Sequence, residues 1–241
     1  MLCRRLPWIF GLSLSALVAM TFAGCDDDGS YRLGLTDFHP PLPDPDGTVR
    51  STWAGAITEA TAAELIDGPA RAGLVGDFYM RNVKARFVIQ AATRTIGVVP
   101  WGGNLVDAVL IGADGKDAVP DHLGEVSVMY MAGRTCAHDK IEVLLDGAGG
   151  GPAVMRASGR SDVNDFINLK GMGFFSIPRA IDPDIADHVE CATTYTLWPE
   201  ATSLEIAWTL FNGGDFAVRG PLATLSDTGG EVQTWAPGLG Y

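Results

Sequence analysis

Short segments rich in β-branched and aromatic residues recur along most of this chain, and they constrain its fold more than any other feature. Beyond Trp53 they are separated by Gly, Asp and Asn turns at intervals of about 8 to 15 residues. In VKARFVIQ, residues 83–90, apolar side chains alternate with Lys84, Arg86 and Gln90, as in a strand with one buried face. This pattern predicts an all-β fold in which two sheets pack on each other.

The same reasoning predicts further strands, over residues 104–111, 125–131, 140–146, 152–159, 191–198 and 203–211. GAGGG at 147–151 is predicted to be a hairpin rather than a phosphate-binding loop, because no Lys-Ser/Thr pair follows it. Helical periodicity is found over 57–68 and over 161–171, where Ser161 or Asp162 is the expected N-cap. We therefore predict a β-sandwich with short helices.

The beginning of the chain has the three parts of an export signal, over residues 1–24. Two arginines precede an apolar segment, residues 6–22, and small residues follow it. This segment is shorter than the ~20 residues that span a bilayer as a helix, which favours a cleaved signal over a transmembrane anchor. FAGC resembles the bacterial lipobox, which implies that Cys25 is lipidated and becomes the new N-terminus. The alternative is a plain signal peptide with an incidental cysteine.

The charge of the chain bears on its partners and location. The formal net charge is −12, and removal of Arg4 and Arg5 with the leader leaves −14. Such a surface repels nucleic acid and anionic head groups, so no nucleic-acid partner is predicted. Two or three acyl chains would hold the protein on a membrane without electrostatic help. We predict a lipid-anchored protein of the cell envelope, on the periplasmic face or the cell surface, and the choice of membrane stays open.

The mature chain divides into a tether and a folded domain. Residues 25–52 are rich in Pro, Asp and Gly and lack apolar periodicity, which is typical of a semi-rigid spacer. The β-sandwich is predicted over 53–241. Its apolar ending, TWAPGLGY, differs from the polar residues usual at a terminus and indicates a domain truncated at its C-terminus.

Cysteine counting predicts one disulfide. Cys3 leaves with the leader and Cys25 takes lipid, so Cys136 and Cys191 remain. An oxidising compartment would allow these two to pair, and closing so long a loop would stabilise the fold by roughly 4 kcal/mol. Two buried free thiols are the alternative.

One cluster suggests a metal site. DPDIADHVE, residues 182–190, offers Asp184, Asp187 and His188 as oxygen and nitrogen ligands for a divalent cation. The alternative is a solvated loop that leads into the strand of Cys191. No cofactor is predicted.

Two further groups of residues are candidate sites. His122 and Glu125 would pair as acid and base if their loop brought them together, and a purely structural loop is the alternative. Trp101 and Trp198 are candidates for an aromatic platform on which a sugar ring stacks, whereas core packing is the other common role of tryptophan in a sandwich.

Four stretches carry a resemblance to known proteins: LIDGPARAGLVGDFYMRNVKARFVIQ (65–90), VPWGGNLVDAVL (99–110), IEVLLDGAGGGPAVMRASG (141–159) and TTYTLWPEATSLEIAWTLFNGGD (193–215). Together they resemble the N-terminal region of large secreted lipoproteins of myxobacteria and their relatives, over most of residues 55–241. That region resembles galactose-mutarotase-like sandwiches, which implies a supersandwich fold. Mutarotases use a histidine acid and a glutamate base, but Leu210 stands before the FN here, so the resemblance implies no catalytic residue.

Three functions remain open on the sequence. The first is a tethered, non-catalytic sandwich that recognises a carbohydrate or a protein, and the second is a structural module for downstream domains absent from this chain. The third is an enzyme of the mutarotase or polysaccharide-lyase kind. The first two are favoured jointly, because the sequence shows no acid–base pair that matches the enzymes.

Overall fold

A computed structural model of the chain describes residues 49–131, 133–164, 173, 188–214 and 222–227. In chain order the strands are β1 (Thr52–Ala56), β2 (Phe78–Asn82), β3 (Ala85–Ile89), β4 (Leu105–Leu110), β5 (Glu125–Tyr130), β6 (Arg134–Leu145), β7 (Ala153–Val163), β8 (Val189–Leu197), β9 (Glu205–Asn212) and β10 (Leu222–Asp227). Each strand from β1 to β9 pairs antiparallel with the next, and β10 pairs with β5. The predicted all-β fold is confirmed.

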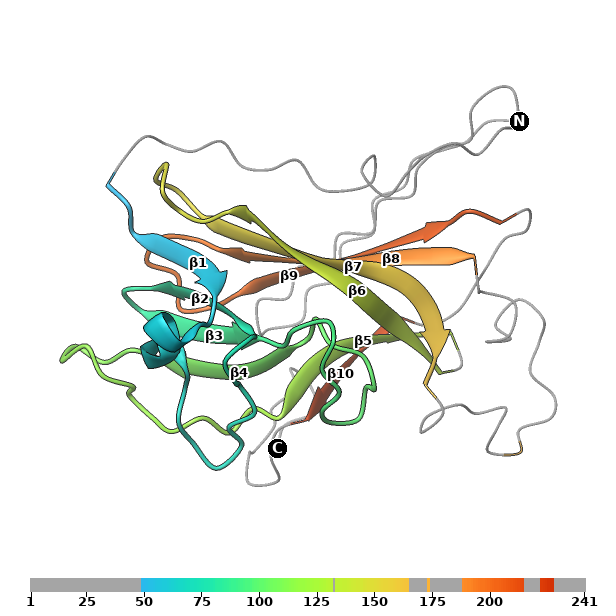
Figure 1. Cartoon of the computed structure of the whole chain (residues 1–241), viewed down its shortest axis with the longest axis horizontal. Helices are drawn as coiled ribbons and strands as arrows, with labels where there is room; N and C mark the ends of the chain where they lie inside the picture. Colours follow the sequence, from blue (N-terminus) through green and yellow to red (C-terminus); the bar gives the residue numbers. More distant parts are fainter. Residues whose placement is uncertain (1–48, 132, 165–172, 174–187, 215–221, 228–241) are drawn as a thin grey trace, which may run out of the picture.

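The sheet folds over at β5, where few backbone pairs join this strand to β4 and β6. β4 meets it only at Leu105–Val126, and β6 only at Met129–Thr135 and Tyr130–Arg134. Strands β1–β4 therefore form one layer and β6–β9 the other (Figure 1). This two-layer arrangement is the predicted sandwich.

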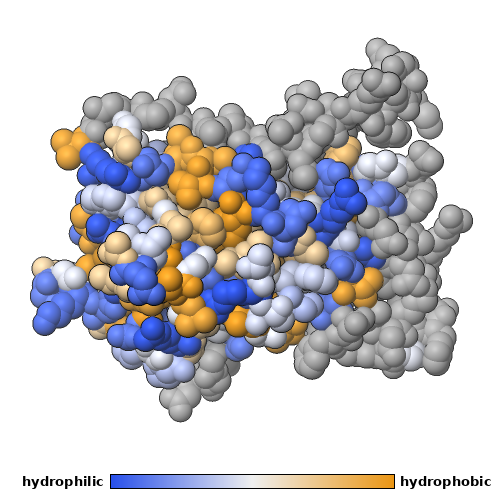
Figure 2. Space-filling view, viewed as in Figure 1, coloured by the Kyte–Doolittle hydropathy of each residue, from blue (hydrophilic) through white to orange (hydrophobic). Residues whose placement is uncertain are grey.

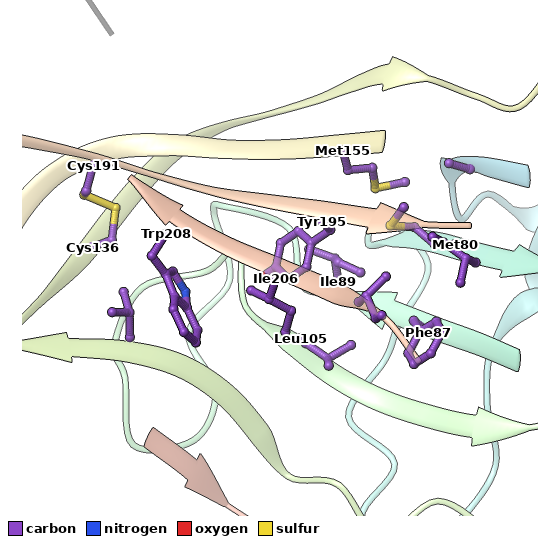
Figure 3. Close-up of a cluster of buried hydrophobic side chains, with 14 of the residues drawn as sticks. Met80, Phe87, Ile89, Leu105, Cys136, Met155, Cys191, Tyr195, Ile206 and Trp208 are labelled. Carbon is purple, nitrogen blue, oxygen red and sulfur yellow. A yellow bond between two sulfur atoms is a disulfide. The ribbon is translucent and has the colours of Figure 1, made fainter. Parts of the chain in front are cut away.

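The main core lies between the two layers. Figure 3 shows side chains from both layers pointing toward one another: Met80, Phe87, Ile89 and Leu105 from the first, and Met155, Tyr195, Ile206 and Trp208 from the second. The predicted shared face of β9 is confirmed, since Ile206 and Trp208 are buried and Leu210 packs against the same cluster. Burial of this apolar surface is the main stabilising contribution, at roughly 25 cal/mol per Å².

A second apolar cluster covers the opposite face of β3 and β4. It consists of Ile57, Ile66, Val88, Val106 and Val109. The segment between β1 and β2 supplies Ile57 and Ile66 and lies over this face. The alternation in residues 83–90 predicts one buried face, but both Val88 and Gln90 are fully enclosed because of this cover.

The helical predictions are corrected by the structure. Within 57–68 the chain forms one short 3-10 helix, η2 (Glu59–Glu64). The helix predicted over 161–171 is wrong at its start, because Ser161, Asp162 and Val163 continue β7 and pair with β6. Ladder hydrogen bonds to a long neighbouring strand outweigh a local capping signal. Most of the remainder of that segment lies outside the described residues.

The predicted disulfide between Cys136 and Cys191 is confirmed, with 5.9 Å between the Cα atoms. It joins β6 to β8, which are not paired with each other, across the intervening β7. Gly159 of β7 stands opposite both His138 and Cys191, and an added Cβ there would overlap the backbone of Ala137 on β6.

Asn82 joins the two layers by hydrogen bonds. Its Nδ2 donates to the carbonyls of Trp198 and Ala201, both at 2.9 Å, in the turn between β8 and β9. Its Oδ1 accepts from the amides of Lys84 at 2.7 Å and Ala85 at 2.8 Å, which closes the β2–β3 turn. All four bonding positions of this buried amide are therefore filled.

Candidate functional site

A groove of about 380 Å³ opens on the outer face of the first layer, between η2, the β2–β3 hairpin and the turn after β4. Its lining consists of Ala63, Glu64, Arg81, Arg86, Ile111, Gly115, Lys116 and Asp117. We call it the arginine groove. In Figure 1 the teal helical turn of η2 and the green turn after β4 lie at the same end of the molecule.

Two arginines stand directly opposite each other in this groove. Arg81 on β2 is the register partner of Arg86 on β3. Like charges at directly opposed positions destabilise a sheet, so each needs an acidic neighbour. Arg81 Nε lies 2.9 Å from Glu64 Oε1, and Arg86 Nη2 lies 2.5 and 2.7 Å from the two oxygens of Asp117.

Arg86 is held by hydrogen bonds from two elements. Its Nη1 donates to the Ala63 carbonyl of η2 at 2.8 Å, while its Nη2 binds Asp117 beyond β4. Its Nε is enclosed and has no hydrogen-bond partner. A planar guanidinium fixed in this way is preorganised for recognition and loses little conformational entropy when a ligand binds.

Trp53 lies beside the groove and contacts two arginines through its ring. It pairs with Arg81 across β1 and β2, and the Arg81 guanidinium carbon lies 4.2 Å from the centroid of its ring. Arg50 approaches the same ring at 5.9 Å and forms an ion pair with Asp146. Cation–π contacts of this kind hold long arginine side chains in place.

The tryptophans predicted to bind a ligand do not line the arginine groove. Trp198 is 45% exposed after β8, and its indole Nε1 donates to Glu205 at 3.2 Å. Trp101 is half-buried with its Nε1 enclosed and without a hydrogen-bond partner. Ligand contact by either remains a prediction.

Of the three predicted metal ligands, only His188 lies among the described residues. Asp184 and Asp187 lie outside the described residues. His188 lies just before β8, where its Nε2 is 2.7 Å from Asn212 Oδ1. In the parts of the chain that the structure describes, no group of three or more His, Cys, Asp or Glu side chains is placed to hold a metal ion.

Glu125 of the proposed acid–base pair has a structural role. It is buried, its Oε2 accepts from the amides of Val98 at 3.1 Å and Val99 at 3.2 Å, and its Oε1 accepts from Asn104 at 2.8 Å. Burial raises the pKa of its carboxyl group, and these donors oppose the rise. Its partner in that prediction, His122, is not among the groups that contact its carboxylate.

His138 and Tyr195 hold the WGGN loop, residues 101–104, from the second layer. His138 Nδ1 lies 2.7 Å from the Gly102 carbonyl, so this nitrogen carries the proton and donates. The Tyr195 hydroxyl donates to the Gly103 carbonyl at 2.8 Å. Burial lowers the pKa of His138 to about 4, which keeps the imidazole neutral at physiological pH.

A second, smaller groove of about 210 Å³ lies beside the β6–β7 hairpin. Its walls are formed by Val143, Leu144, Leu145 and Pro152 together with hairpin glycines, and Asp146 is its charged member. Figure 2 shows hydrophobic surface where β1 and this hairpin meet. Such a lining offers few directional contacts, so the arginine groove is the stronger candidate for a binding site.

Comparison with protein-family models, with curated protein sequences and with solved structures finds no match to this chain. In the described ranges, no helix has the length and apolar character needed to cross a membrane. The choice of the arginine groove as the candidate site therefore rests on the geometry described above.

The sequence contained one signal for the arginine groove that its alternation pattern alone does not reveal. Asn82 indicates a turn between the segments of β2 and β3, and a tight turn there places Arg81 opposite Arg86. Glu64 and Asp117 could not be assigned to them in the same way, because their approach depends on how η2 and the turn after β4 pack on the sheet.

Proposed function

We propose that this protein is a lipid-anchored β-sandwich lipoprotein that recognises a carbohydrate, without catalysis, in the arginine groove. The observation that carries the proposal is the opposed pair Arg81 and Arg86, each fixed by an acidic neighbour, on the floor of an open groove. Rigid, planar polar groups of both charges can exchange hydrogen bonds with sugar hydroxyls.

The dimensions and walls of the groove support this proposal. Its volume of about 380 Å³ is within the range of sites for small ligands. Ala63 and Ile111 give it apolar surface against which the carbon faces of a sugar ring can pack. Guanidinium and carboxylate groups stand beside these apolar residues, so both sides of a pyranose ring find complementary partners.

A catalytic alternative is less well supported by the described residues. His138 and Glu125 are the described groups closest in type to the acid and base of mutarotases, and both are enclosed and engaged with the loop 97–104. Groups that are buried and already bonded to backbone cannot reach a substrate without local opening. Lining residues of the arginine groove include no histidine or tyrosine.

The proposed anchoring is tested on the intact protein. Palmitate labelling of expressing cells is expected to mark the wild type and not a Cys25→Ser variant, and the variant is expected to leave the membrane fraction. An unlabelled wild type would contradict the lipid anchor and leave the groove proposal to its own test.

Carbohydrate recognition is tested with the mature protein purified in detergent micelles and applied to a glycan array. Binding to a defined subset of glycans is expected. Arg86→Met keeps the aliphatic stem and removes the guanidinium, so it should weaken binding at least ten-fold. Arg160→Met, at an exposed position of β7, is the matched control and should bind as the wild type does.

Thermal unfolding of both variants shows whether each is folded at the assay temperature. Absence of glycan binding by the folded wild type would overturn the proposal. Equal binding by folded Arg86→Met and wild type would show that a recognised glycan binds elsewhere.

A further inference from the structure

We infer that the ligand of the arginine groove is an acidic saccharide, whose negative group lies beside Lys116. This inference rests on the proposed function and adds the charge class of the ligand. It follows from which charged groups of the groove are paired with one another and which have no partner.

Four of the five charged groups that line the groove neutralise each other. Arg81 pairs with Glu64, and the exposed fractions of their side chains are 32% and 18%. Arg86 pairs with Asp117, with 17% and 27% exposed. These pairs leave no charge in excess, and their partial burial makes them stronger than fully exposed pairs.

Lys116 is the fifth charged group. Among the residues that the structure describes, no acidic side chain forms an ion pair with it. The groove therefore carries one uncompensated positive charge.

The turn that carries Lys116 is held by hydrogen bonds on both sides. The amide of Gly112 donates to the Lys116 carbonyl at 2.7 Å, and the Lys116 amide donates to Asp114 Oδ1 at 3.1 Å. Ile111 and Asp117 form a β-bridge at the base of the turn. The lysine backbone is thus fixed, and a ligand anion would order only its flexible side chain.

The overall charge of the chain excludes general electrostatic attraction as a source of affinity for anions. A protein with a formal net charge of −12 repels anions over long distances, so an acidic saccharide gains no affinity from general attraction. A preference for acidic over neutral sugars would therefore have to arise from a local group. Either a carboxylate or a sulfate on the sugar could supply the negative charge that pairs with Lys116. The experiment below distinguishes these two groups.

The test uses the mature protein in detergent micelles and titration calorimetry with matched oligosaccharides. The sets are oligogalacturonate, its methyl ester with the same rings and no charge, and a sulfated galactan oligosaccharide. The free acid is expected to bind about five-fold more tightly than its methyl ester, as for one partly exposed ion pair. Lys116→Gln should abolish this difference, and Lys116→Arg should keep it.

Lys140→Gln, on β6 and outside the groove, is the control and should leave the difference unchanged. Equal affinity of acid and ester in the wild type would overturn the inference and leave the proposed function standing. A difference that persists in Lys116→Gln would also overturn it. Binding of the sulfated sugar with loss in Lys116→Gln supports a general anion preference, and preference for the uronate alone supports a carboxylate. Failure of every saccharide, neutral or acidic, on the glycan array would remove the proposed function as well.

Discussion

Asp107 on β4 and Asp121 before β5 are two buried carboxyl groups that lie close enough to repel each other by charge. Asp107 accepts from the amides of Ala72 at 2.8 Å and Gly73 at 2.9 Å. Asp121 Oδ1 accepts from two further amides, whereas its buried Oδ2 has no hydrogen-bond partner. Two buried carboxylates that repel each other favour a proton on one of them.

Burial raises the pKa of Asp107 to about 6 and also raises the pKa of Asp121. The amides that bond to them, and the charges of Arg71 near Asp107 and His122 near Asp121, oppose the rise. The folded state therefore binds more protons than the unfolded state between about pH 4 and pH 6. Because of this, the contribution of the pair to the free energy of unfolding is largest at low pH and is lost as pH rises through about 6.

The first prediction uses Asp121→Asn, which replaces one of the two buried carboxyl groups with a neutral amide. The variant removes a buried negative charge near Asp107, so it should raise the free energy of unfolding at pH 8 by about 1 kcal/mol and flatten its dependence between pH 4 and pH 6. Urea unfolding across this pH range measures both effects. Asp114→Asn, an exposed acid whose oxygen accepts the Lys116 amide, is the control and should change neither. An unchanged pH slope in Asp121→Asn would contradict the titration of these two buried carboxyl groups in this range.

The second prediction concerns the link between the layers at Asn82. Asn82→Ala removes four hydrogen bonds and leaves the carbonyls of Trp198 and Ala201 without this donor, which should lower the free energy of unfolding by about 3 kcal/mol. Val83→Ala, in the same turn and 48% exposed, should change stability by less than about 0.5 kcal/mol. Chemical denaturation of the two variants gives the comparison. Similar losses in both would mean that the turn, and not the amide, matters.

The third prediction concerns the disulfide. Replacing both Cys136 and Cys191 with Ala should lower the free energy of unfolding by about 3 kcal/mol, because the bond restricts the unfolded chain. Unfolding of the double variant, beside the wild type with and without reductant, measures this loss. A double variant as stable as the oxidised wild type would contradict it.

A related prediction concerns Gly159, where the bridge crosses β7. An added Cβ there would overlap the carbonyl oxygen of Ala137 on β6. Gly159→Ala should therefore lower the free energy of unfolding by more than about 3 kcal/mol, which is more than a glycine substitution costs at an open surface position. Gly115→Ala provides a comparison with open space around the Cβ and a φ of 76°, so only backbone strain of about 1 kcal/mol is expected there. Thermal unfolding decides between them, and equal losses would contradict the steric explanation.

The last prediction tests the contact between the second layer and the WGGN loop. Tyr195→Phe removes the hydroxyl that donates to the Gly103 carbonyl and leaves that carbonyl buried without this donor, at a cost of about 2 kcal/mol. Hydrogen exchange of the amides of Gly103 and Asn104 should accelerate more than that of amides in β9. Uniform acceleration would indicate a general loss of stability and not release of the loop.

Local patterns predicted the strands well where apolar and polar residues alternate within the segment itself. The segment 203–211 corresponds to β9, and its alternation identified the buried face that Ile206 and Trp208 occupy. The patterns failed where a distant strand decides. Arg134 to Asp139 extend β6 because β7 is long enough to pair with them, and Ser161 lies in a strand for the same reason.

The sequence by itself determined the all-β class, the β6–β7 hairpin at its glycines and the single pair of cysteines left to form a bridge, because these follow from residue types and short spacings. The tertiary structure decided which charges meet. Arg86 reaches Asp117, Asp107 meets Asp121, and Lys116 lines the groove without an acidic partner among the described residues. Those relationships depend on how turns and layers pack and on the loss of water around each group, and neither is a property of neighbouring residues in the chain.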